Sequence, residues 1–238
     1  MSQAPILLWF RRDLRLDDHP ALSEAALSAR PVIPVFIHDE SVESLGAAPK
    51  WRLGLGLEAF AGALERLGTR LILRRGRASE VIDALISETG AGAVFWTRYY
   101  EPSHIARDRV MKADLAERGI EARSFAGALL FEPKDVTTGA GTPYSVFTPF
   151  WRSVRARDPG RALPTPTRLA GPVDWPRSEA LADWRMGAAM QRGAAVVLPH
   201  LEVGEERALA RLDRFFADAV EGYAEGRDFP KRAVTSGL

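Results

Sequence analysis

The sequence predicts an α/β protein built on a doubly wound, five-stranded parallel sheet. Three observations carry this prediction. Short apolar runs alternate with amphipathic segments along residues 1–132. The apolar runs are continuous rather than alternating, as in strands that are buried on both faces. Single helical segments between consecutive strands imply right-handed crossovers and therefore a parallel sheet. The chain has 238 residues, which suffice for one large domain or for one domain plus part of a second.

The strands and helices follow one another in a regular order. The predicted strands cover residues 5–10, 32–37, 70–73, 93–97 and 122–125. The helices between them are predicted over residues 19–29, 53–67, 78–88 and 104–118. We expect Asp18 and Ser103 to cap the first and last of these helices with side-chain oxygens, and Pro20 fits the first turn. Gly68 and Gly119 end the helices that precede them.

A charged segment, RRDLRLDD, follows the first strand directly. Loops at the carboxyl ends of parallel strands bind ligands in such folds, and residues 11–15 and 97–101 lie in two of these loops. Neither a G-x-G-x-x-G motif after the first strand nor a Walker A motif is present, so an ordinary dinucleotide or P-loop fold is excluded. We expect Arg12 and Arg15 to pair with Asp13, Asp17 or a linker carboxylate, in a structural rather than a catalytic role.

The second half of the chain has a different character. Residues 133–203 are rich in Pro, Gly, Arg and Ala and predict a long linker lying on a surface, with a short helix near residues 178–186. Residues 204–223 predict an amphipathic helix whose apolar face is formed by Leu209, Leu212, Phe216 and Val220. One such helix and an extended tail cannot build a second core, so we expect residues 204–238 to be the start of an incomplete domain.

Composition narrows the classes of function. Lys and Arg number 32 and Asp and Glu 31, and this near-neutral balance is no general signature of nucleic-acid binding. The chain contains no Cys, which excludes disulfides, thiolate catalysis and Cys-ligated metal centres. No apolar run approaches the 18 or so residues of a membrane span, so we expect a soluble, cytoplasmic protein with no membrane partner.

Four motifs in register resemble the DNA photolyase/cryptochrome family. They are WFRRDLRLDDHPAL, WTRYYEP with the later ARD, GTPYSVFTPFWR, and GEERALARLDRFF followed by a Tyr, RDFP and TSGL. The resemblance runs from about residue 8 to residue 238 and is greatest to the microbial cyclobutane-pyrimidine-dimer photolyases.

This resemblance implies an antenna domain over residues 1–132, a linker over 133–203 and the start of an FAD-binding helical domain over 204–238. The implied activity is light-driven, FAD-dependent splitting of pyrimidine dimers in UV-damaged DNA. DNA would bind through a helical domain beyond Leu238, so we expect no repair by this chain alone, and no particular protein partner is implied. A cryptochrome-type blue-light sensor and a free-standing chromophore- or nucleotide-binding module are the alternatives.

The resemblance also implies positions for the cofactors. Tyr223, Thr235 and Ser236 match family residues that contact the FAD phosphates, and hydroxyl groups suit phosphate oxygens. Ser103 and His104 match an Asn-Glu pair that contacts the antenna pterin in folate-binding members. Because the carboxylate is replaced by an imidazole, a folate held differently, a deazaflavin, a flavin or no antenna chromophore all stay open. No catalytic residue and no metal site is assigned in this part of the chain.

Overall fold

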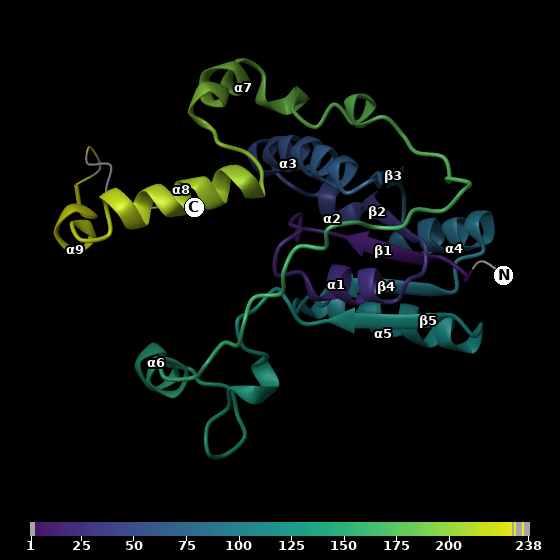
Figure 1. Cartoon of the computed structure of the whole chain (residues 1–238). Helices are drawn as coiled ribbons and strands as arrows, with labels where there is room; N and C mark the ends of the chain where they lie inside the picture. Colours follow the sequence, from purple (N-terminus) through teal and green to yellow (C-terminus); the bar gives the residue numbers. More distant parts are fainter. Residues whose placement is uncertain (1–2, 230, 232–234, 236–238) are drawn as a thin grey trace.

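The computed structural model describes residues 3–229, 231 and 235, and its centre is a five-stranded parallel sheet (Figure 1). The strands are β1 (Ile6–Phe10), β2 (Val32–His38), β3 (Ile72–Arg75), β4 (Ala93–Thr97) and β5 (Glu121–Phe125). They lie in the order β3-β2-β1-β4-β5, and every neighbouring pair is parallel. The predicted fold class is confirmed, although β3 begins two residues later than the sequence pattern indicated.

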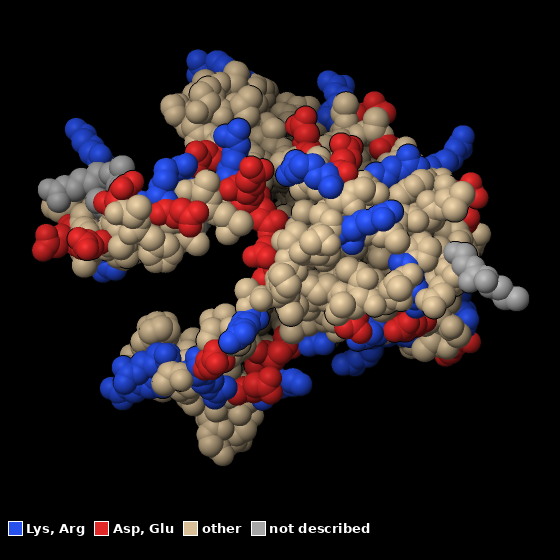
Figure 2. All heavy atoms as spheres, in the orientation of Figure 1, with Lys and Arg blue, Asp and Glu red and all other residues tan. Residues whose placement is uncertain are grey.

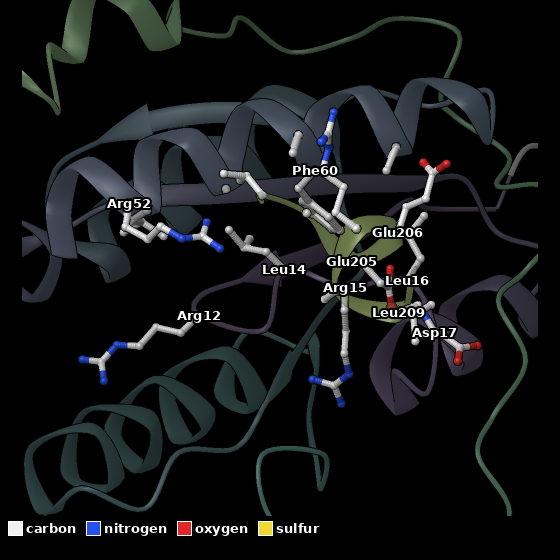
Figure 3. Close-up of a pocket in the computed structure, with 18 of the residues that line it drawn as sticks. Arg12, Leu14, Arg15, Leu16, Asp17, Arg52, Phe60, Glu205, Glu206 and Leu209 are labelled. Carbon is white, nitrogen blue, oxygen red and sulfur yellow. The ribbon is translucent and has the colours of Figure 1, made fainter. Parts of the chain in front are cut away.

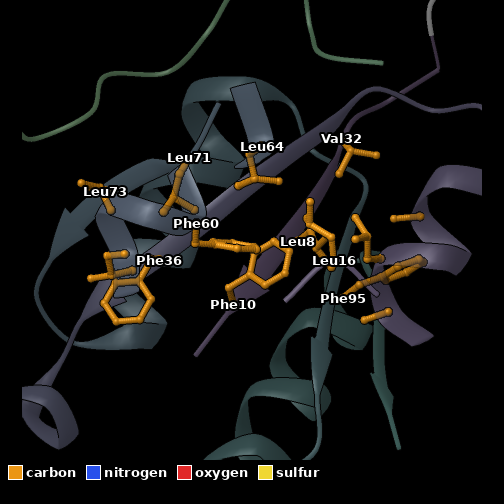
Figure 4. Close-up of a cluster of buried hydrophobic side chains, with 14 of the residues drawn as sticks. Leu8, Phe10, Leu16, Val32, Phe36, Phe60, Leu64, Leu71, Leu73 and Phe95 are labelled. Atoms are coloured by element: carbon orange, nitrogen blue, oxygen red, sulfur yellow. The ribbon is translucent and has the colours of Figure 1, made fainter. Parts of the chain in front are cut away.

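Helices cover both faces of the sheet because successive side chains of a strand point to opposite sides. Leu8 and Phe10 of β1 pack in one core cluster with α1 (Pro20–Leu27) and α3 (Ala47–Arg66), which Figure 4 shows in part. Leu7 and Trp9 pack in a second cluster with α4 (Ala78–Thr89) and α5 (Pro102–Glu117). The short helix α2 (Glu40–Glu43) precedes α3. This two-sided burial explains why the strands are continuous apolar runs.

Two predicted helix caps are wrong. Asp18 adopts a left-handed backbone conformation (φ 47°), and His19 caps α1 by accepting a hydrogen bond from the Leu22 N–H at 3.1 Å. Helix α5 begins at Pro102 after Glu101, so Ser103 lies inside its first turn, exposed to solvent. In both cases Pro occupies the first helical position, where its missing N–H and fixed φ fit, and it places the cap on the preceding residue.

The linker, residues 133–203, packs on the sheet and its covering helices, residues 3–132, as the sequence indicated. We refer to residues 3–132 as the α/β body. Leu169, Trp184 and Met186 belong to the core cluster beside α3, and a Cβ on Gly54 would lie 3.1 Å from the Met186 Cβ. Helix α3 therefore packs closely against the linker at Gly54. The regular segments of the linker are η1 (Pro133–Asp135), α6 (Phe147–Val154), η2 (Leu181–Trp184), η3 (Ala188–Met190), α7 (Arg192–Val197) and η4 (Leu198–His200). The sequence pattern indicated only the segment near η2.

The linker also covers an exposed edge of the sheet. The Leu73 N–H of edge strand β3 donates to the Ser178 Oγ at 3.0 Å, and the Glu179 N–H donates to the Leu73 carbonyl at 2.9 Å. The Arg75 N–H donates to the Glu179 carboxylate at 2.8 Å. Unpaired edge strands template aggregation, so these bonds protect the sheet.

Helices α8 (Glu205–Asp218) and α9 (Tyr223–Gly226) extend away from the α/β body (Figure 1). Helix α8 ends five residues before the predicted end, because the N–H groups of Ala219 and Val220 both turn back to the Phe215 carbonyl. Leu209 is 47% exposed and Phe216 is 59% exposed. Among the described residues, no helix has both the length and the apolar character that a membrane crossing requires.

Candidate functional site

The candidate site lies where the strand order of the sheet reverses. Strand β1 is flanked by β2 and β4, so the loops that leave β1 and β4 diverge at the carboxyl edge, where doubly wound folds bind ligands. We refer to residues 11–18, the segment that follows β1, as the rim loop.

Arg11 anchors the rim loop to the body. Its Nη1 donates to both carboxylate oxygens of Asp108 on α5, at 3.2 and 3.1 Å, and its Nη2 donates to the Thr97 carbonyl. The guanidinium lies 4.1 Å from the ring centre of Tyr99 and 4.9 Å from that of Trp9. Burial lowers the pKa of Arg11 and the Asp108 charge opposes this effect. A buried, two-oxygen ion pair of this kind orients its partners.

Asp13 and His19 form a second buried pair inside the loop. Asp13 accepts hydrogen bonds from the Arg11 N–H at 2.8 Å and from the His19 Nε2 at 2.9 Å. The His19 Nδ1 accepts a hydrogen bond from the Leu22 N–H, so the ring proton is on Nε2. The Nε2–H group therefore donates the hydrogen bond to Asp13. Burial alone raises the pKa of Asp13, but the hydrogen bonds from His19 and from the Arg11 N–H outweigh burial and lower it to about 2. The pair is structural and fixes the shape of the loop.

The predicted partners of Arg12 and Arg15 are wrong. Arg12 pairs with Glu101 at 3.4 Å on the surface, and Arg15 donates to the carbonyls of Asp18 and Gly127, each at 2.8 Å. Charge pattern alone missed Arg11 as the buried partner, since Asp108 lies 97 residues away in sequence. These contacts nonetheless agree with the expected role of the charged segment, which is structural rather than catalytic.

A groove of about 1510 Å³ opens between the rim loop, α3 and the start of α8 (Figure 3). Its apolar lining includes Leu14, Leu16, Leu45, Leu53 and Phe60. Its charged lining comprises Arg12, Arg15, Asp17, Asp18, Arg52, Arg66, Glu205, Glu206 and Arg207. The acidic members gather where α8 meets the body (Figure 2). An apolar floor with guanidinium groups at the rim suits a planar aromatic ligand that carries an anionic tail.

A separate cavity of only about 20 Å³ lies deeper, beside Arg11, Tyr99 and His104. The His104 ring is buried edge-on against Tyr99, 5.4 Å between ring centres, and burial and the Arg107 charge lower its pKa. Ser103 is exposed and lines neither this cavity nor the groove. The structure therefore does not bring Ser103 and His104 together around a space of chromophore size.

The residues that the resemblance assigns to FAD follow α8 in the chain, and the structure describes two of them, Tyr223 and Thr235. Tyr223 packs edge-on against Phe215 at 5.9 Å between ring centres. Thr235 lines a hollow of about 410 Å³ together with His200, Arg211 and Arg214. Hydroxyl and guanidinium donors fit phosphate oxygens, although Glu202 currently accepts from Arg214 at 2.8 and 2.9 Å. Ser236 lies outside the described residues.

Sequence reasoning missed the two arginines of this hollow. Their spacing of three residues on a predicted helix, in RLDR, was the available signal, since residues three apart share a helix face.

The profile of the family described as DNA photolyase matches residues 6–168. The chain belongs to this DNA photolyase family. It is 42% identical over 237 residues to the deoxyribodipyrimidine photo-lyase of Agrobacterium fabrum, a match that covers 99% of this chain and 50% of that protein. The crystal structure of a bacterial class III photolyase from Agrobacterium tumefaciens superposes with a TM-score of 0.92 at 41% identity, over 100% of this chain and 50% of that one.

Cryptochromes are also similar to the chain. Cryptochrome-1 of Arabidopsis thaliana is 37% identical over 170 residues, which are 68% of this chain and 25% of that protein. The chain spans about half the length of the photolyases it matches. The resemblance read from the four motifs is thus confirmed at the level of the family.

Proposed function

We propose that this chain supplies the antenna domain, the linker and the first flavin contacts of a deoxyribodipyrimidine photo-lyase, which splits cyclobutane pyrimidine dimers in DNA with light and FAD. The observation that supports this most is the match to the Agrobacterium fabrum photo-lyase, which covers 99% of the chain. The match to plant cryptochrome-1 covers 68%. Cryptochrome DASH of Gloeobacter violaceus matches 91% of the chain, so coverage alone does not separate the two classes. The identity of 42% to the photo-lyase, against 37% and 31% to these two cryptochromes, favours the enzyme over the sensor.

The proposed domain boundaries are residues 1–132, 133–203 and 204–238, with the linker residues that complete the core counted as part of the folded body. In the third part, Tyr223, Thr235 and Ser236 would hold the FAD phosphates, with Arg211 and Arg214 adding guanidinium donors. FAD, when bound, supplies the light-driven electron donation, and the residues of this chain bind and orient it.

An antenna chromophore, whether a folate, a deazaflavin or a flavin, fits the groove by volume. The cavity at His104 is far smaller, so contact with His104 requires that cavity to open, and Ser103 lines neither space. Absorption spectra of the purified chain test whether it retains a chromophore.

A repair assay tests the enzymatic proposal. The full product of the gene that encodes this chain, and residues 1–238 alone, are each given thymine-dimer DNA, reduced FAD and blue light. We expect dimer loss with the full product and none with residues 1–238. Persistence of dimers with the full product, while reduced FAD is demonstrably bound, contradicts the enzyme and supports the light sensor.

Residues 1–238 are expected to bind FAD weakly or not at all, because the residues that the resemblance assigns to FAD in this chain contact only its phosphate region. Isothermal titration calorimetry checks this expectation, and tight stoichiometric binding contradicts it.

A further inference from the structure

We propose that Glu205 is a positioning residue that fixes α8 against the carboxyl edge of the sheet. Because α8 leads to Tyr223 and contributes Arg211 and Arg214 to the hollow at Thr235, Glu205 sets where the proposed flavin contacts stand relative to the antenna domain. The importance of this placement rests on the proposed function, whereas the contact itself does not.

The contact joins distant parts of the chain through both oxygens of one carboxylate. Glu205 Oε2 accepts a hydrogen bond from the Leu16 N–H at 2.7 Å, and Oε1 accepts from the Asp17 N–H at 2.9 Å. These residues are 189 and 188 positions apart in sequence. Hydrogen bonds to an ionised acceptor are about twice as strong as neutral ones, and two adjacent donors fix direction as well as distance.

The other attachments of α8 to the α/β body are weaker, and the two-oxygen contact of Arg214 with Glu202 joins the helix only to the segment just before it. None of the 14 described residues of α8 is buried. The neighbouring Glu206 approaches Arg66 at 3.6 Å with both side chains mostly exposed, a type of pair that contributes little. Arg52 donates to the Glu202 carbonyl just before the helix, at 3.4 Å. The orientation of α8 therefore depends mainly on the carboxylate of Glu205.

The rim loop is prepared to receive this carboxylate. Asp13, held by His19, accepts from the Arg11 N–H, and the Asp13 carbonyl accepts from the Arg15 N–H at 2.8 Å. These bonds tighten the loop so that the next amides, of Leu16 and Asp17, are free to donate outward. The buried side chains of Arg11, Asp13 and His19 thus shape the backbone of the rim loop, and this backbone binds Glu205.

Nearby carboxylates are turned to other partners, which limits their repulsion of Glu205. Asp17 Oδ1 accepts from the Thr165 hydroxyl at 3.2 Å, and Asp18 Oδ1 accepts from the Leu163 N–H at 3.1 Å. On the α8 side, Gly204 has a φ of 99° and packs so closely that a Cβ would lie 3.2 Å from the Ala59 Cβ. This close approach, which favours glycine, lets Glu205 reach the loop.

Because α8 is long, a small rotation at its first turn causes a large displacement of its far end. With 14 residues the helix is about 21 Å long. A rotation of ~10° at its first turn moves its far end by roughly 4 Å, from the rise of 1.5 Å per residue. If the contact at Glu205 were weakened, Tyr223 would therefore occupy a wider range of positions.

Spin labels measure this placement directly, since the chain has no Cys of its own. Cys residues are introduced at two exposed positions, Glu58→Cys on α3 and Ala217→Cys on α8, and the distance distribution is measured by pulsed electron resonance. In this labelled chain, Glu205→Gln places an NH₂ group against one of the two amides. We expect the distribution to broaden by roughly a factor of two, since one charged double contact is lost.

Glu206→Gln is the matched control, because it removes a neighbouring carboxylate of the same helical turn. We expect an unchanged distribution for it. Gly204→Ala is the second variant, and its strained φ should broaden the distribution as Glu205→Gln does. Far-UV circular dichroism confirms that every variant keeps the body folded.

An unchanged distribution in Glu205→Gln overturns the proposal, as does equal broadening in Glu206→Gln. The measurement requires neither light nor flavin. Its failure leaves the photo-lyase proposal intact, and a negative repair assay leaves the Glu205 contact intact.

Discussion

The α/β body and helices α6 and α8 differ in how far their apolar side chains are buried. All five residues of β1 are buried, and the linker fills the remaining core and covers the β3 edge. By contrast, α6 and α8 extend from one side of the body with open space between them (Figures 1 and 2). On α6, Phe147 and Trp151 stack on each other while 70% and 50% exposed. An amphipathic sequence thus specifies that a helix has an apolar face, but not which element packs against that face.

The largest expected difference between these regions concerns single core side chains. Phe10→Ala removes a fully buried ring that packs on Phe60, and we expect it to lower the free energy of unfolding by about 3–5 kcal/mol. Leu209→Ala on α8 should change it by less than about 0.5 kcal/mol, as for surface substitutions. Urea unfolding of both variants checks this, and equal losses would remove the distinction.

Ion pairs should separate the regions almost as strongly. Asp108→Asn leaves Arg11 buried without its countercharge, and we expect a loss of about 3 kcal/mol. Glu206→Gln removes the exposed pair with Arg66 and should cost less than about 1 kcal/mol. Denaturant midpoints of the two variants measure the difference, and a large loss in Glu206→Gln would show that α8 is anchored by surface charge.

Two tryptophans of the linker sharpen the comparison. Trp184 is buried against Phe36 and donates to Glu179 at 2.7 Å, so Trp184→Ala should cost about 3 kcal/mol. Trp151→Ala, on exposed α6, should cost less than about 1 kcal/mol, mostly from its stacking on Phe147. Thermal unfolding tests the pair. Similar losses would mean that α6 is as integral to the folded unit as the segment at Trp184.

The smallest expected effect is on pH dependence. Burial and the Arg75 charge lower the pKa of His38, whose ring packs against Trp184. The unfolded state binds a proton more readily, so the contribution of His38 is present above about pH 6.5 and is lost as pH falls below it.

We expect His38→Gln to flatten the decline in unfolding free energy between about pH 7 and pH 5. His200→Gln, outside the body, serves as the control and should keep the decline. A parallel decline in His38→Gln and the parent chain would assign the pH dependence to other groups.

The sequence by itself determined the five strands, the parallel sheet and the apolar face of α8. Strand burial and helix periodicity are written in residues at most a few positions apart, so pattern reveals them. The four motifs likewise identified the family.

Only the tertiary structure decided which charges meet. The crossovers bring Arg11 to Asp108 and Glu205 to the rim loop, and the linker brings Trp184 to the core. Local context could favour several partners for each group, as Arg12 and Arg15 show. The choice among them depends on contacts that form only when segments nearly a hundred or more residues apart are packed together, because side-chain pairing acts at a few ångströms and not along the sequence.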